Sequence, residues 1–505
     1  MGLLDNLALG FATAFSLTNL FYCFVGVLIG TVTGILPGIG PVAAVAMLLP
    51  LTFVMPPVGA LIMIAGIYYG TQYGGSTTAI LINVPGDAGS VVTCLDGHAM
   101  AKDGRAGPAL AVAALSSLFA GCVGTVAIAL IGPPLAELAF SFRSPEYFSL
   151  MVLGLLMACF MGEGSPLKSI GMVLLGLLWG CIGTDVNSGL PRYSFGDNRL
   201  AEGISFSVLA MGVFAVSEMI LNLQLPDQRE LLTRKIGRLM INLAELKESW
   251  KAVLRGTAVG GFMGILPGVG PVISAFAAYM FEKRVAKDPS RFGKGAIEGV
   301  ASPEAANNMA AQTSFIPTLT LGLPGSATMA LLLGAMIIQG ITPGPQVMTK
   351  HPELFWGLIA SMWIGNLMLV VLNLPLIPLW VRMLMVPARW LWPSIILICC
   401  IGAYSVNNSA FDILVMLVFG LFGFLFVKLG CEPTPLLLGF VLGPMLEEHM
   451  RRSLLLSRGD FSVFVTRPIS LVLLLAAAAV VAHVLFSAYR ARSKRTPGAS
   501  PSAGG

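Results

Sequence analysis

The amino-acid sequence predicts an all-α polytopic membrane protein with roughly 10–12 membrane elements, arranged as two inverted repeats with Pro-Gly broken or re-entrant helices. Three observations support this fold class. Of 505 residues, 56% are hydrophobic and only 11% are charged, whereas soluble domains carry about 25% charged residues. Residues 6–86 and 305–349 contain no charged residue and no histidine. Residues 34–42 (GILPGIGPV) and 264–272 (GILPGVGPV) are identical at eight of nine positions.

The apolar runs follow one another at lengths suited to membrane helices, because one crossing needs about 20 apolar residues. We expect a first membrane repeat over residues 1–225 and a second over 256–490. Between them, residues 226–255 read as an amphipathic cytoplasmic connector, and residues 491–505 read as a disordered tail. The apolar runs lie near residues 11–35, 42–55, 57–70, 107–132, 145–162, 166–183, 203–224, 256–281, 308–340, 353–381, 390–406, 410–427, 433–446 and 468–489.

The distribution of basic residues predicts how the chain is oriented. Basic residues concentrate on the cytoplasmic side of a membrane, so the basic cluster at residues 490–495 predicts a cytoplasmic C-terminus. Basic residues also flank the second nonapeptide, at 251–255 and at 283–287, whereas the first copy has no basic flank. These flanks predict re-entrant hairpins that enter from opposite sides, and one kinked span at each copy is the alternative.

Each nonapeptide is expected to interrupt a helix. Pro37 and Pro41 cannot donate backbone hydrogen bonds, and Gly38 and Gly40 permit positive φ. A helix that stops here leaves carbonyl groups that suit a cation, and the next helix begins with amide groups that suit a carboxylate. The alternative is that the Pro-Gly pairs only kink or pack helices.

A second break follows in each half, at residues 84–88 (VPGDA) and 323–327 (LPGSA). Glutamine, serine and threonine precede both breaks, and hydroxyl and amide groups can bind an ion or a carboxylate without burying a full charge. The alternative for the hydroxyls is that they cap helices or bond to nearby carbonyls. The predicted substrate- or ion-binding residues are Pro37, Gly38, Ile39, Gly40, Pro41, Gly74, Gly75, Ser76, Thr77, Pro85, Gly86, Asp87, Pro267, Gly268, Val269, Gly270, Pro271, Asn307, Asn308, Pro324, Gly325 and Ser326.

Other classes of function find little support in the sequence. The eight cysteines form no C-x-x-C pair and the four histidines have no ligand spacing, so no resident metal is predicted, although a transient cation such as sodium fits the breaks. No phosphate-binding loop and no hydrolase motif is present, which disfavours an enzyme. The sequence has no basic stripe interleaved with aromatic residues, so a nucleic-acid partner is not predicted. Asp96 is expected on a loop surface, and among the isolated acids only Asp87, which lies at a break, is selected.

Five strings carry a resemblance to a known family. They are residues 34–41 (GILPGIGP), 69–76 (YGTQYGGS), 293–300 (GKGAIEGV), 303–308 (PEAANN) and 321–326 (LGLPGS). Together they resemble the large membrane subunit of the tripartite tricarboxylate transporters, the TctA family, over about residues 15–450.

The resemblance implies a multi-pass permease of the bacterial inner membrane that imports a citrate-like or other carboxylate by symport. It implies two partners, which are a periplasmic substrate-binding protein and a small membrane subunit of about four spans. It also implies that an ion gradient, of sodium or protons, drives uptake in place of ATP, with no other cofactor. An anion channel and a membrane-embedded enzyme are the alternative functions.

Overall fold

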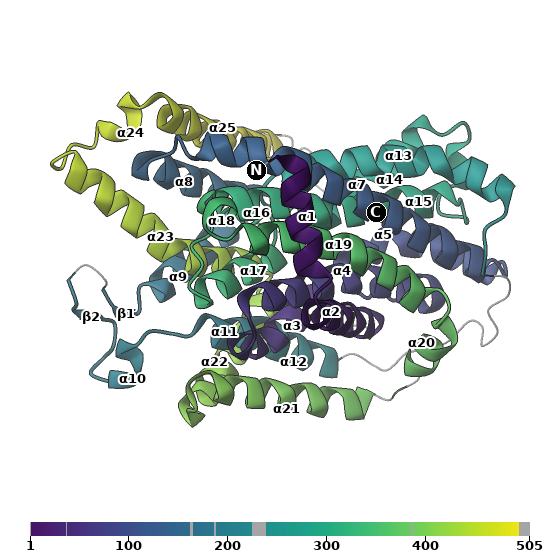
Figure 1. The fold of residues 1–505 in the computed structure, drawn as a ribbon, viewed down its shortest axis with the longest axis horizontal. Coiled ribbons are helices and arrows are strands. Elements are labelled where there is room, and N and C mark those ends of the chain that lie inside the picture. Colours follow the sequence, from purple (N-terminus) through teal and green to yellow (C-terminus); the bar gives the residue numbers. More distant parts are fainter. Residues whose placement is uncertain are drawn as a thin grey trace, which may run out of the picture.

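The computed structural model describes residues 2–36, 38–161, 165–185, 188–224, 239–384, 386 and 388–493. Helices account for almost all regular structure in these residues, as Figure 1 shows, and the predicted all-α polytopic fold is confirmed. Within the described residues, five helices are long and apolar enough to cross a membrane, and seven shorter apolar helices accompany them. The five are Leu17–Ile35, Ala106–Ala139, Phe206–Leu223, Pro352–Asn373 and Ala410–Lys428.

The elements fall on either side of residues 225–238, which lie outside the described residues. This gap includes the first part of the predicted connector at 226–255. Most of the predicted tail, residues 494–505, also lies outside. Before the gap lie α1 (Leu3–Ala14), α2 (Leu17–Ile35), α3 (Gly40–Leu48), η1 (Leu49–Val54), α4 (Pro57–Ile82), η2 (Ala88–Ser90), α5 (Val91–Thr93), η3 (Cys94–His98), α6 (Ala99–Lys102), α7 (Ala106–Ala139), α8 (Ser144–Met161), α9 (Pro166–Gly180), β1 (Gly183–Thr184), β2 (Pro191–Arg192), α10 (Asn198–Ala201), α11 (Phe206–Ala210), η4 (Met211–Val216) and α12 (Ser217–Leu223). After it lie α13 (Leu243–Ile265), α14 (Gly270–Val285), η5 (Pro289–Arg291), α15 (Glu298–Thr313), α16 (Phe315–Leu321), α17 (Ala327–Ile338), α18 (Gln346–Lys350), α19 (Pro352–Asn373), α20 (Ile377–Leu384), α21 (Ala388–Asn407), α22 (Ala410–Lys428), α23 (Thr434–Leu456), α24 (Val463–Thr466) and α25 (Pro468–Ser493).

Helices α2 and α4 lie in backbone contact along a stripe of glycines. Gly26, Gly30 and Gly34 follow one another at intervals of four residues on α2, and a Cβ atom on any of them would lie 2.4–2.5 Å from a backbone oxygen of α4. Small residues at this spacing let two helices approach closely, which is how membrane helices gain packing energy in place of a hydrophobic driving force. In return, α4 presents Gly66, Gly70 and Gly74 to α2.

Helices α13 and α15 repeat this contact in the second half. Gly256, Gly260 and Gly264 occupy the same places before the second nonapeptide as the α2 glycines do before the first. A Cβ atom on any of the three would lie 2.2–2.6 Å from a backbone oxygen of α15. The same helix pair is therefore built twice, and in each pair the nonapeptide begins where the glycine stripe ends.

The second nonapeptide lies at the turn of a helical hairpin. Arg255 on α13 and Glu282 on α14 are 27 residues apart in sequence, yet the arginine Nε lies 2.8 Å from a glutamate oxygen. Two helices in line could not bring these residues together, because each residue of a helix advances the axis by about 1.5 Å. Helices α13 and α14 therefore turn back on each other around residues 266–269.

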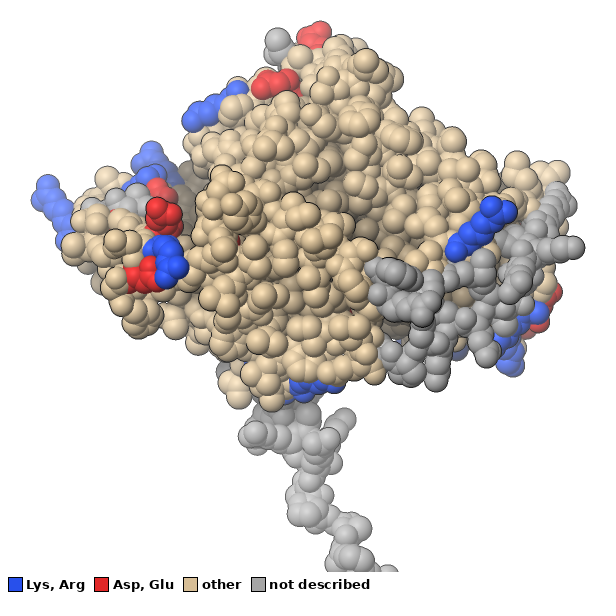
Figure 2. Space-filling view, turned by 90° about the horizontal axis from the view of Figure 1, so that it is seen from below, with Lys and Arg blue, Asp and Glu red and all other residues tan. Residues whose placement is uncertain are grey.

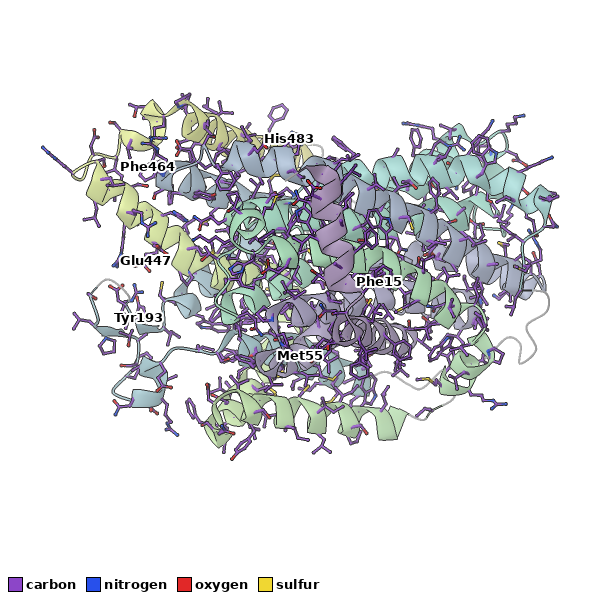
Figure 3. All side chains as sticks on the ribbon, in the orientation of Figure 1. Phe15, Met55, Tyr193, Glu447, Phe464 and His483 are labelled. Atoms are coloured by element: carbon purple, nitrogen blue, oxygen red, sulfur yellow. The ribbon has the colours of Figure 1, made fainter. Side chains whose placement is uncertain are left out.

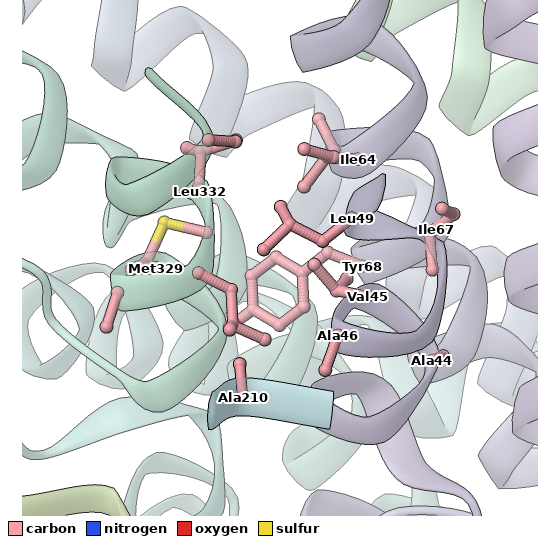
Figure 4. Packing of buried hydrophobic residues seen from close by; sticks show 14 of the residues in the cluster. Ala44, Val45, Ala46, Leu49, Ile64, Ile67, Tyr68, Ala210, Met329 and Leu332 are labelled. Atoms are coloured by element: carbon pink, nitrogen blue, oxygen red, sulfur yellow. The ribbon is translucent and has the colours of Figure 1, made fainter. Parts of the chain in front are cut away.

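The two halves interlock through helices that follow the second breaks. Helix α7 packs along α15 of the other half, and α19 packs along α4. Near the centre, α3 lies against α17, and α14 lies against η2. Figure 4 shows the apolar packing there, where the ring of Tyr68 lies among side chains of α3, η1, α11 and α17.

Asp96 locks the η3 turn of the first half to the loop before α15. One carboxylate oxygen accepts hydrogen bonds from the backbone N–H groups of Gly293, Gly295 and Ala296 at 2.8–2.9 Å. The other oxygen accepts from the Tyr279 hydroxyl at 2.9 Å. Asp96 is fully buried, so the prediction of a loop surface is wrong. This contact explains the glycines in the string at residues 293–300, because the backbone of this loop folds around the Asp96 carboxylate.

Uncharged residues cover most of one face of the molecule (Figure 2). On the face shown in Figure 2, Lys, Arg, Asp and Glu gather in small groups near the edges, and other residues cover most of the rest. Helix α22 exposes Leu414, Leu417, Leu421 and Leu425 along one side, at the spacing of one helix face. Such an apolar face fits contact with lipid.

A small hairpin lies at one end of the molecule. Strands β1 and β2 pair antiparallel, with Gly183 opposite Arg192. The Arg192 side chain reaches a carboxylate oxygen of Glu447 on α23 at 2.9 Å, and Figure 3 labels Glu447 and the neighbouring Tyr193. This ion pair fastens the hairpin to the helices.

We predict that Gly260→Ala destabilises the protein, whereas Gly171→Ala does not. The added Cβ at residue 260 would lie 2.4 Å from the Ala306 oxygen and force α13 away from α15, at a cost of about 1–3 kcal/mol. Gly171 lies on α9, and beyond its own stretch of helix backbone no described atom lies within 4 Å of an added Cβ, so alanine there is neutral or stabilising. Thermal unfolding of the purified protein in detergent measures both. Equal unfolding midpoints would contradict the close packing.

We also predict that Asp96→Ala lowers the unfolding free energy by about 2–4 kcal/mol, because a buried N–H group without an acceptor costs about 1–3 kcal/mol. Asp103→Ala is the control, since Asp103 is an exposed aspartate a few residues further along. Its effect should stay within about 0.5 kcal/mol. A thermal unfolding midpoint of the Asp96 variant equal to that of the control would show that the carboxylate does not hold the loop.

Candidate functional site

All four predicted breaks line one cavity of about 450 Å³. A cavity of this size is in the range of small-molecule sites. Its walls come from both halves of the chain and from helices far apart in sequence. The lining residues are Gly38–Ala43, Tyr68, Gln72, Pro85–Gly89, Ala158, Phe214, Glu218, Gly268–Ile273, Gly325–Thr328, Glu432, Thr434 and Leu438.

The two nonapeptides have the same backbone geometry. Gly38 and Gly268 have φ values of +87° and +81°, and Gly40 and Gly270 have φ values of +59° and +61°. Only glycine adopts such angles at little cost, so the spacing of two glycines forces the chain to leave one helix and start another. Helices α3 and α14 begin at the second of these glycines, each with proline in its first turn. The amide groups at the start of both helices therefore lie beside the cavity.

The second breaks are also equivalent in geometry. Asn83 ends α4 and Gly322 ends α16, both in the left-handed region at φ +56° and +71°. Asp87 then caps the η2 turn by accepting a hydrogen bond from Gly89 N at 2.9 Å. Ser326 caps α17 by accepting from Met329 N at 3.3 Å. Each half thus directs a helix start and a polar cap toward the same cavity.

Hydrogen bonds hold the breaks in place. Gly268 N donates to Gly325 O at 3.1 Å and so joins the two breaks of the second half. In the first half, the Asn222 amide donates to Gly38 O at 2.9 Å. The carbonyl groups that the sequence predicted to be free are therefore partly used for structure.

Asn307 does not line the cavity itself, but it contacts two residues that do. Its amide nitrogen donates to Gln72 Oε1 at 2.8 Å. Its carbonyl oxygen faces Gly89, because a Cβ atom on that glycine would lie 2.3 Å away from it. Both Gln72 and Gly89 line the cavity, and Gln72 is a functional candidate that was not selected from the sequence.

Several predicted site residues lie away from the cavity. Pro37 is outside the described residues, and Pro267 and Pro324 belong to breaks without lining the cavity. The others are buried in α4 and α15. Gly74 contacts the Thr31 oxygen of α2, and a Cβ on Gly75 would lie 2.2 Å from Asp87 Oδ1. These glycines make room for neighbours, and neither they nor Ser76, Thr77 and Asn308 line the cavity.

A second polar cluster surrounds Glu304, which is fully buried in α15. Its carboxylate accepts from Ser76 Oγ at 2.7 Å and from the Thr93 hydroxyl. Asn308 donates to Ser117 Oγ at 2.7 Å beside it. Glu304 was not selected from the sequence, although a carboxylate within an apolar helix is itself the signal that could have found it.

The cavity contains acidic side chains without basic ones. Asp87, Glu218 and Glu432 line it, and among the described residues no Lys, Arg or His does. Glu218 lies in α12, and its side chain accepts from the Asn222 amide at 3.3 Å. Among the described lining groups, an anionic group that enters this cavity would therefore meet backbone amides and hydroxyls.

Comparisons with known proteins match nearly the whole chain. A family model described as the tripartite tricarboxylate transporter TctA family matches residues 20–438. The chain is 55% identical over 492 residues to an uncharacterized 52.8 kDa protein in the TAR-I ttuC' 3' region of Agrobacterium vitis, which covers 97% of this chain and 98% of that protein. A second uncharacterized protein, in the TAR-II ttuC' 3' region of the same organism, is 61% identical over 215 residues, or 43% of this chain and 89% of that protein. No solved structure matches.

We predict that Gly268→Ala destabilises the protein more than Gly189→Ala. Both glycines have positive φ, +81° and +69°, so alanine costs about 1–2 kcal/mol at either place. Only at residue 268 would the new Cβ also press on another helix, 3.0 Å from Ala158 Cα. Thermal unfolding of the two variants separates backbone strain from crowding. If Gly189→Ala proved the more destabilising change, the close packing of this break would be refuted.

Proposed function

Since the chain belongs to the tripartite tricarboxylate transporter TctA family, we propose that it is the permease subunit that imports an organic di- or tricarboxylate across the bacterial inner membrane. The family is a transporter family whose members work in tripartite systems, and the chain is a multi-pass membrane protein. The substrate, the direction of transport and the driving force are our proposal.

The observation that carries the proposal is the convergence of all four breaks on one cavity. Secondary transporters bind solute and ions where interrupted helices meet, because helix starts offer amides to an anion and helix ends offer carbonyls to a cation. The starts of α3, α14 and α17 supply such amides here. The carboxylate groups of the substrate would bind at these helix starts.

We propose that a cation gradient, of sodium or of protons, drives uptake. A carboxylate anion in a cavity lined by Asp87 and Glu218, with no Lys, Arg or His among the described lining residues, would be repelled unless positive charge entered with it. Binding of a cation would offset the acids and let the anion bind, and this order of events couples the two fluxes. No ATP hydrolysis is required in this scheme.

The packing of the two halves suggests which parts of the protein move during transport. We propose that residues 1–225 and 256–490 are two inverted repeats joined by the connector at 226–255, and that one packed pair, α2 with α4 or α13 with α15, rocks against the other. Each pair is held together by its glycine stripe, whereas the cavity is lined by the breaks that follow both pairs. Rocking would open the cavity to one side of the membrane at a time.

Two partner proteins complete the proposal. A periplasmic substrate-binding protein would deliver the solute, and a small membrane subunit of about four spans would assemble with this chain. The exposed apolar side of α22 is available to lipid or to a membrane subunit.

We predict concentrative uptake of labelled citrate or a dicarboxylate into proteoliposomes that contain this chain and both partners. Sodium and proton gradients are imposed separately, without ATP, and uptake should need the binding protein and one of the gradients. Gly268→Leu serves as the inactive control, because Gly268 has φ +81° and a Cβ there would lie 3.0 Å from Ala158 Cα, so leucine distorts this break.

Flux down the solute gradient without any cation gradient would contradict the proposal and favour an anion channel, which also predicts a measurable single-channel current. Conversion of the solute into a new product would favour an enzyme. Full uptake by the Gly268→Leu protein would remove the role of the breaks.

A further inference from the structure

The two second breaks are equivalent in sequence but differ in charge. The separation that relates the two Pro-Gly pairs also relates Asp87 to Ser326 and Tyr68 to Asn307. Each cap residue lies next to the equivalent helix residue of the other half, so Asp87 is near Asn307 and Ser326 is near Tyr68. The cavity therefore has two matching ends, one with a carboxylate and an amide and the other with two hydroxyls.

At the first end, buried oxygen atoms converge without enough donors. Asp87 Oδ2 accepts from Gly89 N, whereas Asp87 Oδ1 is buried and has no hydrogen bond within the described residues. Asn307 Oδ1 is likewise buried without a described donor. A Cβ atom on Gly89 would lie 2.3 Å from Asn307 Oδ1 and 2.8 Å from Asp87 Oδ2, so these two oxygens lie beside the same glycine, whereas Asp87 Oδ1 of the same carboxylate faces Gly75.

At the second end, the groups can donate. Ser326 caps the 12-residue helix α17, whose first amides lie beside the cavity. The buried Tyr68 hydroxyl has no hydrogen bond within the described residues, although it lies beside Ser314 and Ser326. Hydroxyl groups and amides at a helix start suit a negative group.

The first end needs positive charge for a physical reason. Burying an ionised carboxylate costs several kcal/mol unless it is paired or binds a metal, and no described Lys, Arg or His lines the cavity. Carboxylate and amide oxygens are ligands for hard cations. The described residues contain no cluster of three or more acidic, histidine or cysteine side chains that could hold a metal ion, and a single carboxylate here favours one positive charge over two.

We propose that a monovalent metal cation binds between the Asp87 carboxylate and the Asn307 side-chain carbonyl, with Gln72 holding the Asn307 amide in the orientation that presents this oxygen. The opposite end, at Ser326 and Tyr68, then receives the negative group of the solute. The divergence of two equivalent residue pairs, Asp87 with Ser326 and Asn307 with Tyr68, gives the two ends opposite charge preferences. The coupling role of this site rests on the proposed function, but the binding of the ion does not.

The test measures ion binding on the purified full-length protein in detergent, without transport. Thermal unfolding is followed while sodium chloride or potassium chloride replaces choline chloride at constant ionic strength. We expect the midpoint to rise saturably with one of the metal ions, because a ligand that binds only the folded state stabilises it. Asp87→Asn and Asn307→Ala should each raise the half-saturating concentration at least about tenfold, as loss of a group that binds or orients a metal does.

Ser326→Ala is the matched control, because it changes the equivalent position at the other end of the cavity and should leave the ion dependence unchanged. Asp87→Asn keeps an acceptor for Gly89 N, so the η2 cap is retained. The proposal is overturned if neither metal ion stabilises the wild-type protein beyond choline. It is also overturned if Asp87→Asn keeps the wild-type dependence, or if Ser326→Ala shifts it as much. Saturable stabilisation that Asp87→Asn abolishes, in a protein whose uptake ignores that ion, would support the site and refute cation coupling.

Discussion

Backbone contact between paired helices is the constraint on which the rest of the structure depends. Where α2 meets α4 and α13 meets α15, any side chain larger than hydrogen on the glycine stripe would overlap a backbone oxygen. This fixes the register of each pair to one arrangement, because a shift by one residue would place larger side chains at the contact. The nonapeptides follow directly after the stripes, so the register of the pair also fixes where each break lies. Rigid pairs that end in irregular backbone are what an alternating-access site requires.

Equivalent geometry in the two halves explains how one cavity can treat opposite charges differently. The breaks match in φ, in their capping and in their neighbours. Because the backbones match, a difference at one pair of equivalent positions, such as Asp87 in the first half and Ser326 in the second, changes the chemistry of one end without changing its shape. A duplicated scaffold therefore separates the two requirements of a coupled site, because the backbone positions both ligands while a few side chains decide which ligand binds where.

The sequence predicted the parts of the site that depend on local backbone chemistry. Two glycines and two prolines at short spacing interrupt a helix through their own backbone geometry, so all four breaks could be found from the residues alone. Asp87 and Ser326 were selected as binding residues, whereas their capping of η2 and α17 was not predicted. Residues whose role depends on the partner helix were harder to assign. Gly74, Gly75, Ser76 and Asn308 sit in polar or glycine-rich strings that read as ligands, yet α4 and α15 turn them toward each other or toward neighbouring helices.

Asp96 and Gln72 were not recognised from the sequence because their roles also depend on contacts with distant parts of the chain. Asp96 looked like a loop residue because its acceptor role depends on backbone N–H groups at 293–296, far along the chain. The glycine stripes were readable in principle, since glycines repeat every four residues at equal distances before each nonapeptide. That regularity describes helix packing and needs no knowledge of the fold, whereas the position of Gln72 beside the cavity needs the contact between the halves.

The acids of the cavity and the buried Glu304 illustrate two ways of keeping a carboxylate at membrane depth. Glu304 is surrounded by hydroxyl groups of three different elements, α4, α5 and α7, which donate to it directly. Asp87 has one backbone donor and leaves its second oxygen without one in the described structure. A fully satisfied acid stabilises one arrangement of helices and gains nothing from a visiting ion. An incompletely satisfied acid beside a cavity makes the energy of the protein depend on what occupies that cavity, and this dependence is the physical basis on which ion binding can drive solute movement.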